Sequence, residues 1–63
     1  MKVTYDKDVD ALNIQFQSGD YETSEEISKG IIVDYSKEGK IMDIEILDAS
    51  KRVSLKEIDK IER

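Results

Sequence analysis

One stretch decides the fold: Gly30–Leu47, with the sequence GIIVDYSKEGKIMDIEIL. Its first part, Gly30–Tyr35, is rich in β-branched residues, which favour a strand with both faces covered. Ser36–Lys40 supplies turn residues, with Gly39 at a position suited to positive φ. Ile41–Leu47 alternates, so that one face of the strand is apolar and the other is mixed. The stretch therefore predicts a β-hairpin.

The segments before the hairpin also show strand periodicity. Residues 3–5 alternate and predict a short first strand. Ala11–Gln17 alternates cleanly, with its large apolar residues on one face, and predicts a second strand. Tyr21–Ser28 is less regular. We interpret it as an edge strand with charged side chains, although its Thr23-x-x-Glu26 pattern also fits the start of a helical turn.

The C-terminal segment changes its period and predicts a helix. Ser54 and Glu57 have the spacing of a capping box, and Val53 and Ile58 fit a hydrophobic staple around it. An apolar stripe follows, formed by Leu55, Ile58 and Ile61. A helix of about nine residues is unstable alone and must dock on the sheet. The sequence therefore predicts a single α+β domain over residues 1–63, a small antiparallel β-meander of about four strands covered by one short C-terminal helix.

The charge balance excludes several kinds of partner. Ten Lys and Arg residues face fifteen Asp and Glu residues, which gives a net charge of −5. Nucleic-acid binding needs a clustered basic surface, and the only adjacent basic pair is Lys51-Arg52, so we expect no nucleic-acid partner. An acidic surface favours a basic protein partner. The same charge is also ordinary for a small domain that is merely kept soluble.

The sequence also indicates where the chain is located and how it assembles. No apolar run approaches the about 20 residues that cross a membrane, and Met1–Asp6 turns polar at once, unlike a signal peptide. We therefore expect no membrane partner. The chain has no cysteine, which fits a cytoplasmic location. A domain this short has a thin core, so a homodimer is one way to supplement it.

The residue types argue against an enzyme. Without Cys or His, the chain has no ordinary Ser-His or Cys-His pair for nucleophilic catalysis and no His or Cys zinc site. Asp6-x-Asp8-x-Asp10 has the spacing that opens a calcium loop, but Ala11 and Gln17 stand where that loop needs Gly and Glu. We interpret this motif as a turn in which the Asp side chains bond the local backbone. No cofactor is predicted.

Carboxylates gather on the predicted hairpin, where Asp34, Asp43, Glu45 and Asp48 can come together. Paired carboxylates can perform acid–base catalysis or bind a divalent cation. So small a domain, however, rarely encloses a pocket that tunes them. We predict instead a partner-binding surface made of Ile32, Asp34, Asp43, Glu45 and Leu47. The alternative is a carboxylate-based divalent-metal-binding protein or a small metal-dependent enzyme.

Three segments together resemble a known family: Tyr5–Ile14, Gly30–Tyr35 and Gly39–Ser50. The family is the small prokaryotic one called domain of unknown function 2283, and the similarity covers about residues 1–50. Its most distinctive part is Ile44–Ser50. Asn13 and Asp43 depart from the family pattern, which has an aromatic and a small residue there. The resemblance implies a compact, cytoplasmic, β-rich protein with no assigned activity and no established catalytic residues. Some members are encoded beside small toxins, which suggests an antitoxin role for them.

These observations converge on a non-enzymatic function. The sequence predicts a small acidic cytoplasmic interaction module, antitoxin-like in type, that binds a basic protein and can form a homodimer.

Overall fold

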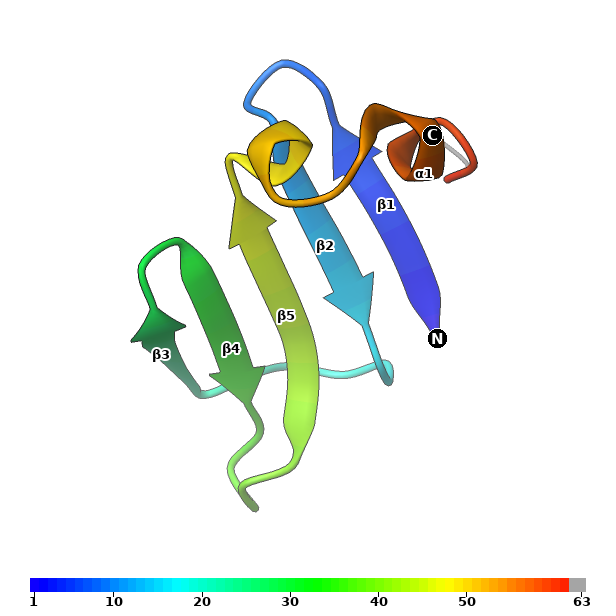
Figure 1. Cartoon of the computed structure of the whole chain (residues 1–63). Coiled ribbons are helices and arrows are strands. Elements are labelled where there is room, and N and C mark those ends of the chain that lie inside the picture. Colours follow the sequence, from blue (N-terminus) through cyan, green and yellow to red (C-terminus); the bar gives the residue numbers. More distant parts are fainter. Residues whose placement is uncertain (62–63) are drawn as a thin grey trace.

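The computed structural model describes residues 1–61, which form a five-stranded antiparallel sheet with a short helical segment at its C-terminal end (Figure 1). The strands are β1 (Lys2–Asp6), β2 (Ala11–Gln15), β3 (Thr23–Ser28), β4 (Ile31–Tyr35) and β5 (Ile41–Leu47). A 3₁₀ turn, η1 (Ala49–Lys51), and one turn of α-helix, α1 (Leu55–Ile58), follow. No helix among residues 1–61 is long and apolar enough to cross a membrane.

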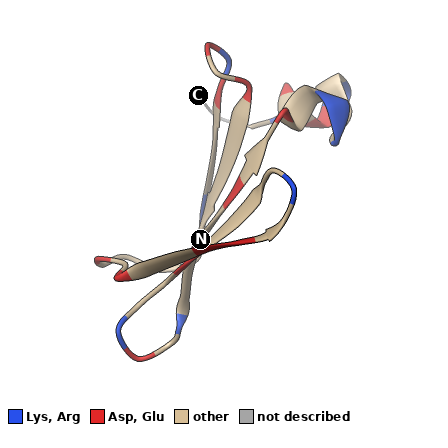
Figure 2. Ribbon diagram, turned by 90° about the vertical axis from the view of Figure 1, so that its left-hand side faces the viewer, with Lys and Arg blue, Asp and Glu red and all other residues tan. Residues whose placement is uncertain are grey.

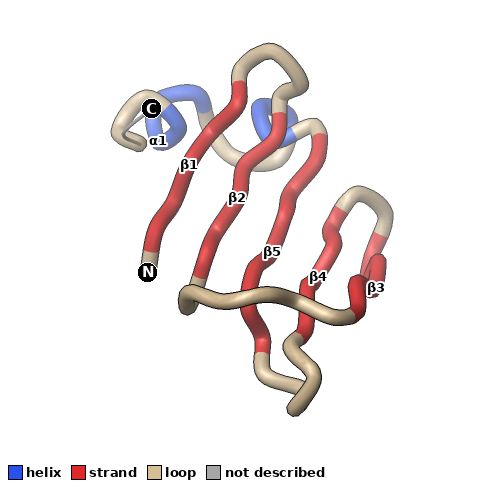
Figure 3. The backbone as a smooth tube through the Cα atoms, turned by 180° about the vertical axis from the view of Figure 1, so that it is seen from behind, coloured by secondary structure: helices blue, strands red, loops and turns tan. Residues whose placement is uncertain are grey.

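The α+β class and the β4–β5 hairpin are confirmed, but the number of strands is higher than expected. The sheet has five strands rather than about four. The edge strand expected within Tyr21–Ser28 is confirmed over Thr23–Ser28, which pairs with β4 with one bulge between Glu26 and Ser28. The strand order, β1-β2-β5-β4-β3, also departs from a simple meander. Strand β5 lies between β2 and β4, and the connection from β2 to β3 crosses β5 and β4 near their ends (Figure 3).

Figures 1 and 3 show the crossing connection on the side of the sheet opposite to the helical segment. A Cβ atom at Gly19 would lie 3.3 Å from Cε of Met42, and Gly19 has a φ of 127°, which side chains rarely adopt. The backbone conformation favours glycine here. Met42 and Val33 are buried, with 5% and 3% of their surfaces exposed. The connection therefore lies close to the Met42 side chain, at the start of β5.

The main core lies between the sheet and the C-terminal segment. Leu12, Ala49 and Ile58 are buried together there. Four partly buried side chains pack around them: Tyr5, Ile46, Val53 and Ile61. Since η1 and α1 follow β5 directly, this segment turns back over the ends of β1, β2 and β5 (Figure 1).

The helix begins where the sequence indicates but is shorter than expected. The Ser54 Oγ accepts a hydrogen bond from the Glu57 N–H, as an N-cap should. Val53 and Ile58 both reach the core, as the staple predicts. Leu55, in contrast, leaves 61% of its surface exposed. A single turn can aim only one side of its surface at the sheet, and Ile58 occupies that side.

Substitution of Ile58 tests whether this short segment holds the core. The side chain is 1% exposed, so Ile58→Ala should lower the free energy of unfolding by about 2 to 4 kcal/mol. The exposed Leu55 is the matched control, and Leu55→Ala should change it by less than about 0.5 kcal/mol. Denaturant unfolding measures both. Equal losses for the two variants would show that the helix does not dock as described.

Candidate functional site

The five residues predicted as a partner surface lie together on one face of the sheet. In the β4–β5 pair, Ile32 lies opposite Glu45 and Asp34 lies opposite Asp43. Leu47 follows two residues after Glu45 on the same strand, so it points the same way. Directly opposite residues share a face in an antiparallel pair. We call this surface, formed by Ile32, Asp34, Asp43, Glu45 and Leu47, the acidic face.

The neighbouring strands extend the acidic face. The strand pairing places Asp6 of β1 and Glu26 of β3 on the same side of the sheet, together with Lys2. Among residues 1–61, Lys2 is the one Lys or Arg that lies in a strand. The other basic residues lie in turns and in the C-terminal segment, whereas acidic residues also lie along the strands (Figure 2). The middle of the sheet therefore presents negative charge.

The acidic face is open to solvent and mixed in character. None of its five residues is buried, and all five are partly exposed. The helical segment packs on the opposite face, against Leu12 and Ile46. At one end, the Arg52 guanidinium donates to the Lys29 carbonyl, beside Gly30 and Leu47. The result is a surface with apolar side chains set between carboxylates, which suits a partner with the opposite charge.

Two carboxylates of the acidic face oppose each other directly. Asp34 and Asp43 are cross-strand partners, and like charges in this position destabilise a sheet. The Ser24 hydroxyl donates a hydrogen bond of 2.6 Å to Asp34 Oδ1. This bond orients Asp34. It does not involve Asp43 or Glu45, which both lie in the central strand β5. The arrangement costs stability unless a cation or a basic side chain lies between the carboxylates.

The grouping expected from the sequence does not extend to Asp48. This residue lies beyond the end of β5, where it precedes η1 in the left-handed conformation with a φ of 52°. Among residues 1–61, no group of three or more Asp, Glu, His or Cys side chains is arranged to hold a metal ion. The divalent-cation alternative stays a prediction from the sequence.

A second polar cluster, which the sequence analysis did not predict, joins the turn between β1 and β2 to η1. Asp10 Oδ1 accepts hydrogen bonds from the Tyr5 hydroxyl at 2.6 Å and from the Ser50 N–H at 3.0 Å, and Asp10 Oδ2 accepts one from the Ser50 hydroxyl at 2.7 Å. The Asp10 carbonyl also accepts the Ala49 N–H. We call this cluster the Asp10 clamp. It ties the β1–β2 turn to η1, so its chemistry is structural.

The first turn otherwise behaves as the sequence indicates. Asp6 Oδ1 accepts a hydrogen bond from the Asp8 N–H, so this side chain bonds the local backbone as expected. Asp10 differs because it has a φ of 53° and reaches to Ser50, 40 residues away. The hydrogen bonds from Tyr5 and Ser50 lower the pKa of Asp10 below its ordinary value of 3.8, because they favour the charged form.

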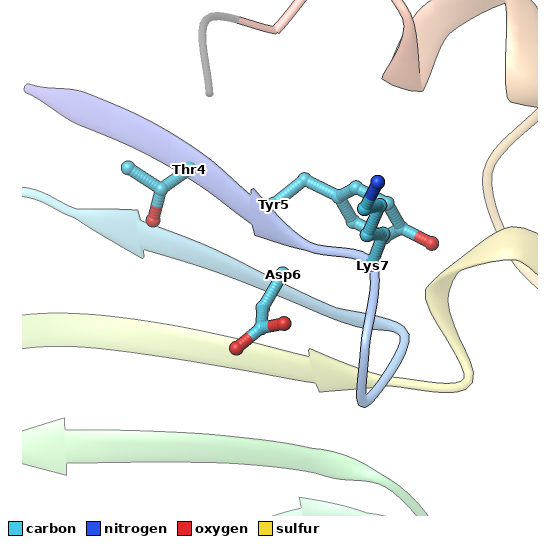
Figure 4. Close-up of a pocket in the computed structure, with 4 residues that line it drawn as sticks. All are labelled: Thr4, Tyr5, Asp6 and Lys7. Atoms are coloured by element: carbon cyan, nitrogen blue, oxygen red, sulfur yellow. The ribbon is translucent and has the colours of Figure 1, made fainter.

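An open pocket lies beside the end of β1 and the turn that follows it. Four consecutive residues line it: Thr4, Tyr5, Asp6 and Lys7 (Figure 4). Thr4 and Asp6 point to one side of the strand and Tyr5 to the other (Figure 4). Consecutive residues can line one pocket only where the edge of the strand itself forms its wall.

Comparison with known proteins places this fold in a family. The family model described as protein of unknown function (DUF2283) matches residues 2–50. The chain belongs to this family. The match covers all five strands and the first residues of η1, and so includes both the acidic face and the Asp10 clamp. No curated protein and no solved structure matches the chain.

The Asp10 clamp gives this DUF2283 protein a pH-dependent stability. Because the pKa of Asp10 is lower in the folded chain than the ordinary 3.8, the clamp contributes its stability above that value and loses it as the pH falls through the folded pKa. Asp10→Asn should therefore unfold at a lower temperature than the parent at pH 7. The difference should shrink as the pH falls below 3.8.

Asp8→Asn is the matched control for this prediction, because Asp8 lies in the same turn and its side chain is exposed. Thermal melts followed by circular dichroism from pH 7 to the acid limit measure both variants. A constant difference between Asp10→Asn and the parent at every pH would contradict the assignment of the effect to the Asp10 carboxylate.

Proposed function

We propose that this protein is a non-enzymatic interaction module that binds a basic partner protein through its acidic face. The observation that carries the proposal is the cross-strand arrangement of Asp34, Asp43 and Glu45 with Ile32 and Leu47, on the side of the sheet away from the helical segment. Carboxylates steer a basic partner and the apolar side chains beside them gain from desolvation when it docks.

The energetics of the face also support binding. The cross-strand position of Asp34 opposite Asp43 is unfavourable in the free protein. An arginine of a partner, placed between the two carboxylates, would turn this repulsion into two attractive contacts. The gain on binding is then larger than that of an isolated surface ion pair, because the bound state also relieves a cost of the free state.

An antitoxin-like role in the cytoplasm is the form of this function that we favour. A small toxic protein with a basic working surface would be neutralised by a domain that covers that surface with acidic and apolar groups. The net charge of −5 supports this proposal.

Neutralisation of the acidic face tests the proposal. The triple variant Asp34→Asn, Asp43→Asn, Glu45→Gln removes the charge with little change in shape, and tagged protein is used to capture partners from extracts of its native cells. The parent should retain a basic protein that is released at high salt, because screening weakens such contacts. The triple variant should retain at least about tenfold less, since three charge-assisted contacts are lost.

The control carries the same change in charge elsewhere. Asp20, Glu22 and Glu38 are exposed and lie outside the strands, so Asp20→Asn, Glu22→Gln, Glu38→Gln should bind like the parent. Equal capture by the parent and the acidic-face variant, or a retained protein that salt does not release, would contradict the proposal.

A further inference from the structure

Strand β3 is an open edge of the sheet. It lies at one end of the strand order, and Figures 1 and 3 show no other part of residues 1–61 beyond it. All six of its residues, Thr23–Ser28, are exposed. Its pairing with β4 is regular from Thr23 to Glu26 and is interrupted by a bulge between Glu26 and Ser28. The regular part of such an edge offers unpaired backbone groups to another strand.

The hydrogen bonds of β4 show which of these groups point outwards. The Leu47 N–H donates a hydrogen bond of 2.8 Å to the Gly30 carbonyl, which extends the β4–β5 register by one residue. Because bonded and unbonded pairs alternate in an antiparallel ladder, Ile32 and Asp34 also bond to β5. Val33 lies between them and therefore directs its N–H and C=O groups to β3, on the other side.

The same alternation continues into β3. Glu25 is the partner of Val33, so its backbone groups point inwards to β4. Its neighbours Ser24 and Glu26 therefore direct their N–H and C=O groups away from the sheet. Within residues 1–61, no backbone hydrogen bond joins Ser24 or Glu26 to a loop or a turn. We call this segment, Ser24–Glu26, the β3 edge site.

Charge decides which kind of strand the β3 edge site accepts. Strand β3 contains two Glu residues and no Lys or Arg. Glu26 lies opposite Ile32 on the acidic face, whereas Glu25 lies opposite Val33 on the other face. A second copy of β3 would bring carboxylates together without a cation, which destabilises a sheet. A basic strand, in contrast, gains an opposite-charge pair on each face.

The short side chain of Ser24 connects the β3 edge site to the opposed carboxylates. Ser24 lies opposite Asp34, and its hydroxyl donates to Asp34 Oδ1. A residue of an added strand opposite Ser24 lies two strand spacings, about 10 Å, from Asp34. The side chains of an arginine and an aspartate together span this distance. An arginine at that place therefore reaches over Ser24 to the pair formed by Asp34 and Asp43.

We propose that the basic partner adds an extended segment to the sheet at the β3 edge site, with basic side chains opposite Ser24, Glu25 and Glu26. This inference rests on the proposed function, because it specifies how the partner of the acidic face docks. Backbone hydrogen bonds to Ser24 and Glu26 hold the added strand, and its basic side chains select it. The residues opposite Ser24 and Glu26 lie on the acidic face, and the residue opposite Glu25 lies on the other face.

Amide hydrogen exchange tests the added strand on the unaltered chain. The probe is the capped peptide Thr-Val-Arg-Arg-Arg-Val-Thr, used at up to about 1 mM, the weak end of specific affinities. In the free protein, the Ser24 and Glu26 amides should exchange at least about tenfold faster than the Glu25 amide, which bonds to β4. The peptide should slow the Ser24 and Glu26 amides by about tenfold or more and change the Glu25 amide less.

The control peptide carries N-methyl groups on its first and third arginines, which face Glu26 and Ser24 in an antiparallel addition. It keeps every side chain and every charge but lacks the two backbone donors, so it should protect neither amide. Equal protection by the two peptides would overturn the proposal. So would a lack of protection by the unmodified peptide.

Two substitutions extend the test to the affinity for the unmodified peptide. Glu25→Lys changes a side chain outside the acidic face and should weaken binding about tenfold or more, because an attractive cross-strand pair becomes repulsive. Glu38→Lys makes the same change in the exposed β4–β5 turn and should bind like the parent. Ser24→Pro removes an outward N–H and should also weaken binding about tenfold, whereas Ser24→Ala, which keeps this N–H, should weaken it less. Equal affinities of Glu25→Lys and Glu38→Lys would contradict the edge site.

The failure of this proposal can be distinguished from the failure of the proposed function. Capture of a basic protein that depends on the acidic-face carboxylates, with Ser24 and Glu26 amides that no basic peptide protects, would overturn strand addition and leave the proposed function standing. Protection of both amides, with capture that is insensitive to the acidic-face triple variant, would instead support the β3 edge site and overturn the acidic face as the docking surface.

Discussion

The pairing of β5 with both β2 and β4 is the interaction on which the rest of this structure depends. Because side chains alternate along a strand, this one central strand sets the character of both faces of the sheet. Ile44 and Ile46 point to the side on which the helical segment packs, and Asp43 and Glu45 point to the other side. A shift of β5 by one residue would bury the carboxylates and expose the core.

The helical segment that packs on the sheet, formed by η1 and α1, is too short to fold alone. Its stability therefore depends on its contacts with the sheet. One turn of helix has little intrinsic stability. It is held by Ile58 in the core and by the Asp10 clamp, which fixes the start of the segment at Ala49 and Ser50. These contacts place the helical segment on the face opposite to the acidic face.

The sequence alone predicts the parts of this structure that depend on interactions between residues close together in the chain. The alternation of Ile41–Leu47 and the glycine at position 39 are enough to predict the β4–β5 hairpin, and Ser54 is enough to place the start of the helix. The pairing of β2 with β5 joins residues that are far apart in the sequence, and no turn chemistry encodes it. The Asp10–Ser50 contact depends on that pairing, so it could not be predicted either. The acidic face was predicted because it lies within one hairpin.

We propose that the carboxylates of the acidic face serve binding at a cost in the stability of the free protein. The most direct measurement is the free energy of unfolding of Asp43→Asn at pH 7 in low salt, because Asp43 lies directly opposite Asp34. We expect a gain of about 0.2 to 1 kcal/mol over the parent, because repulsion between opposed carboxylates is removed, and a smaller gain at high salt. A loss of stability would overturn this proposal, because it would make Asp43 a structural residue of the sheet.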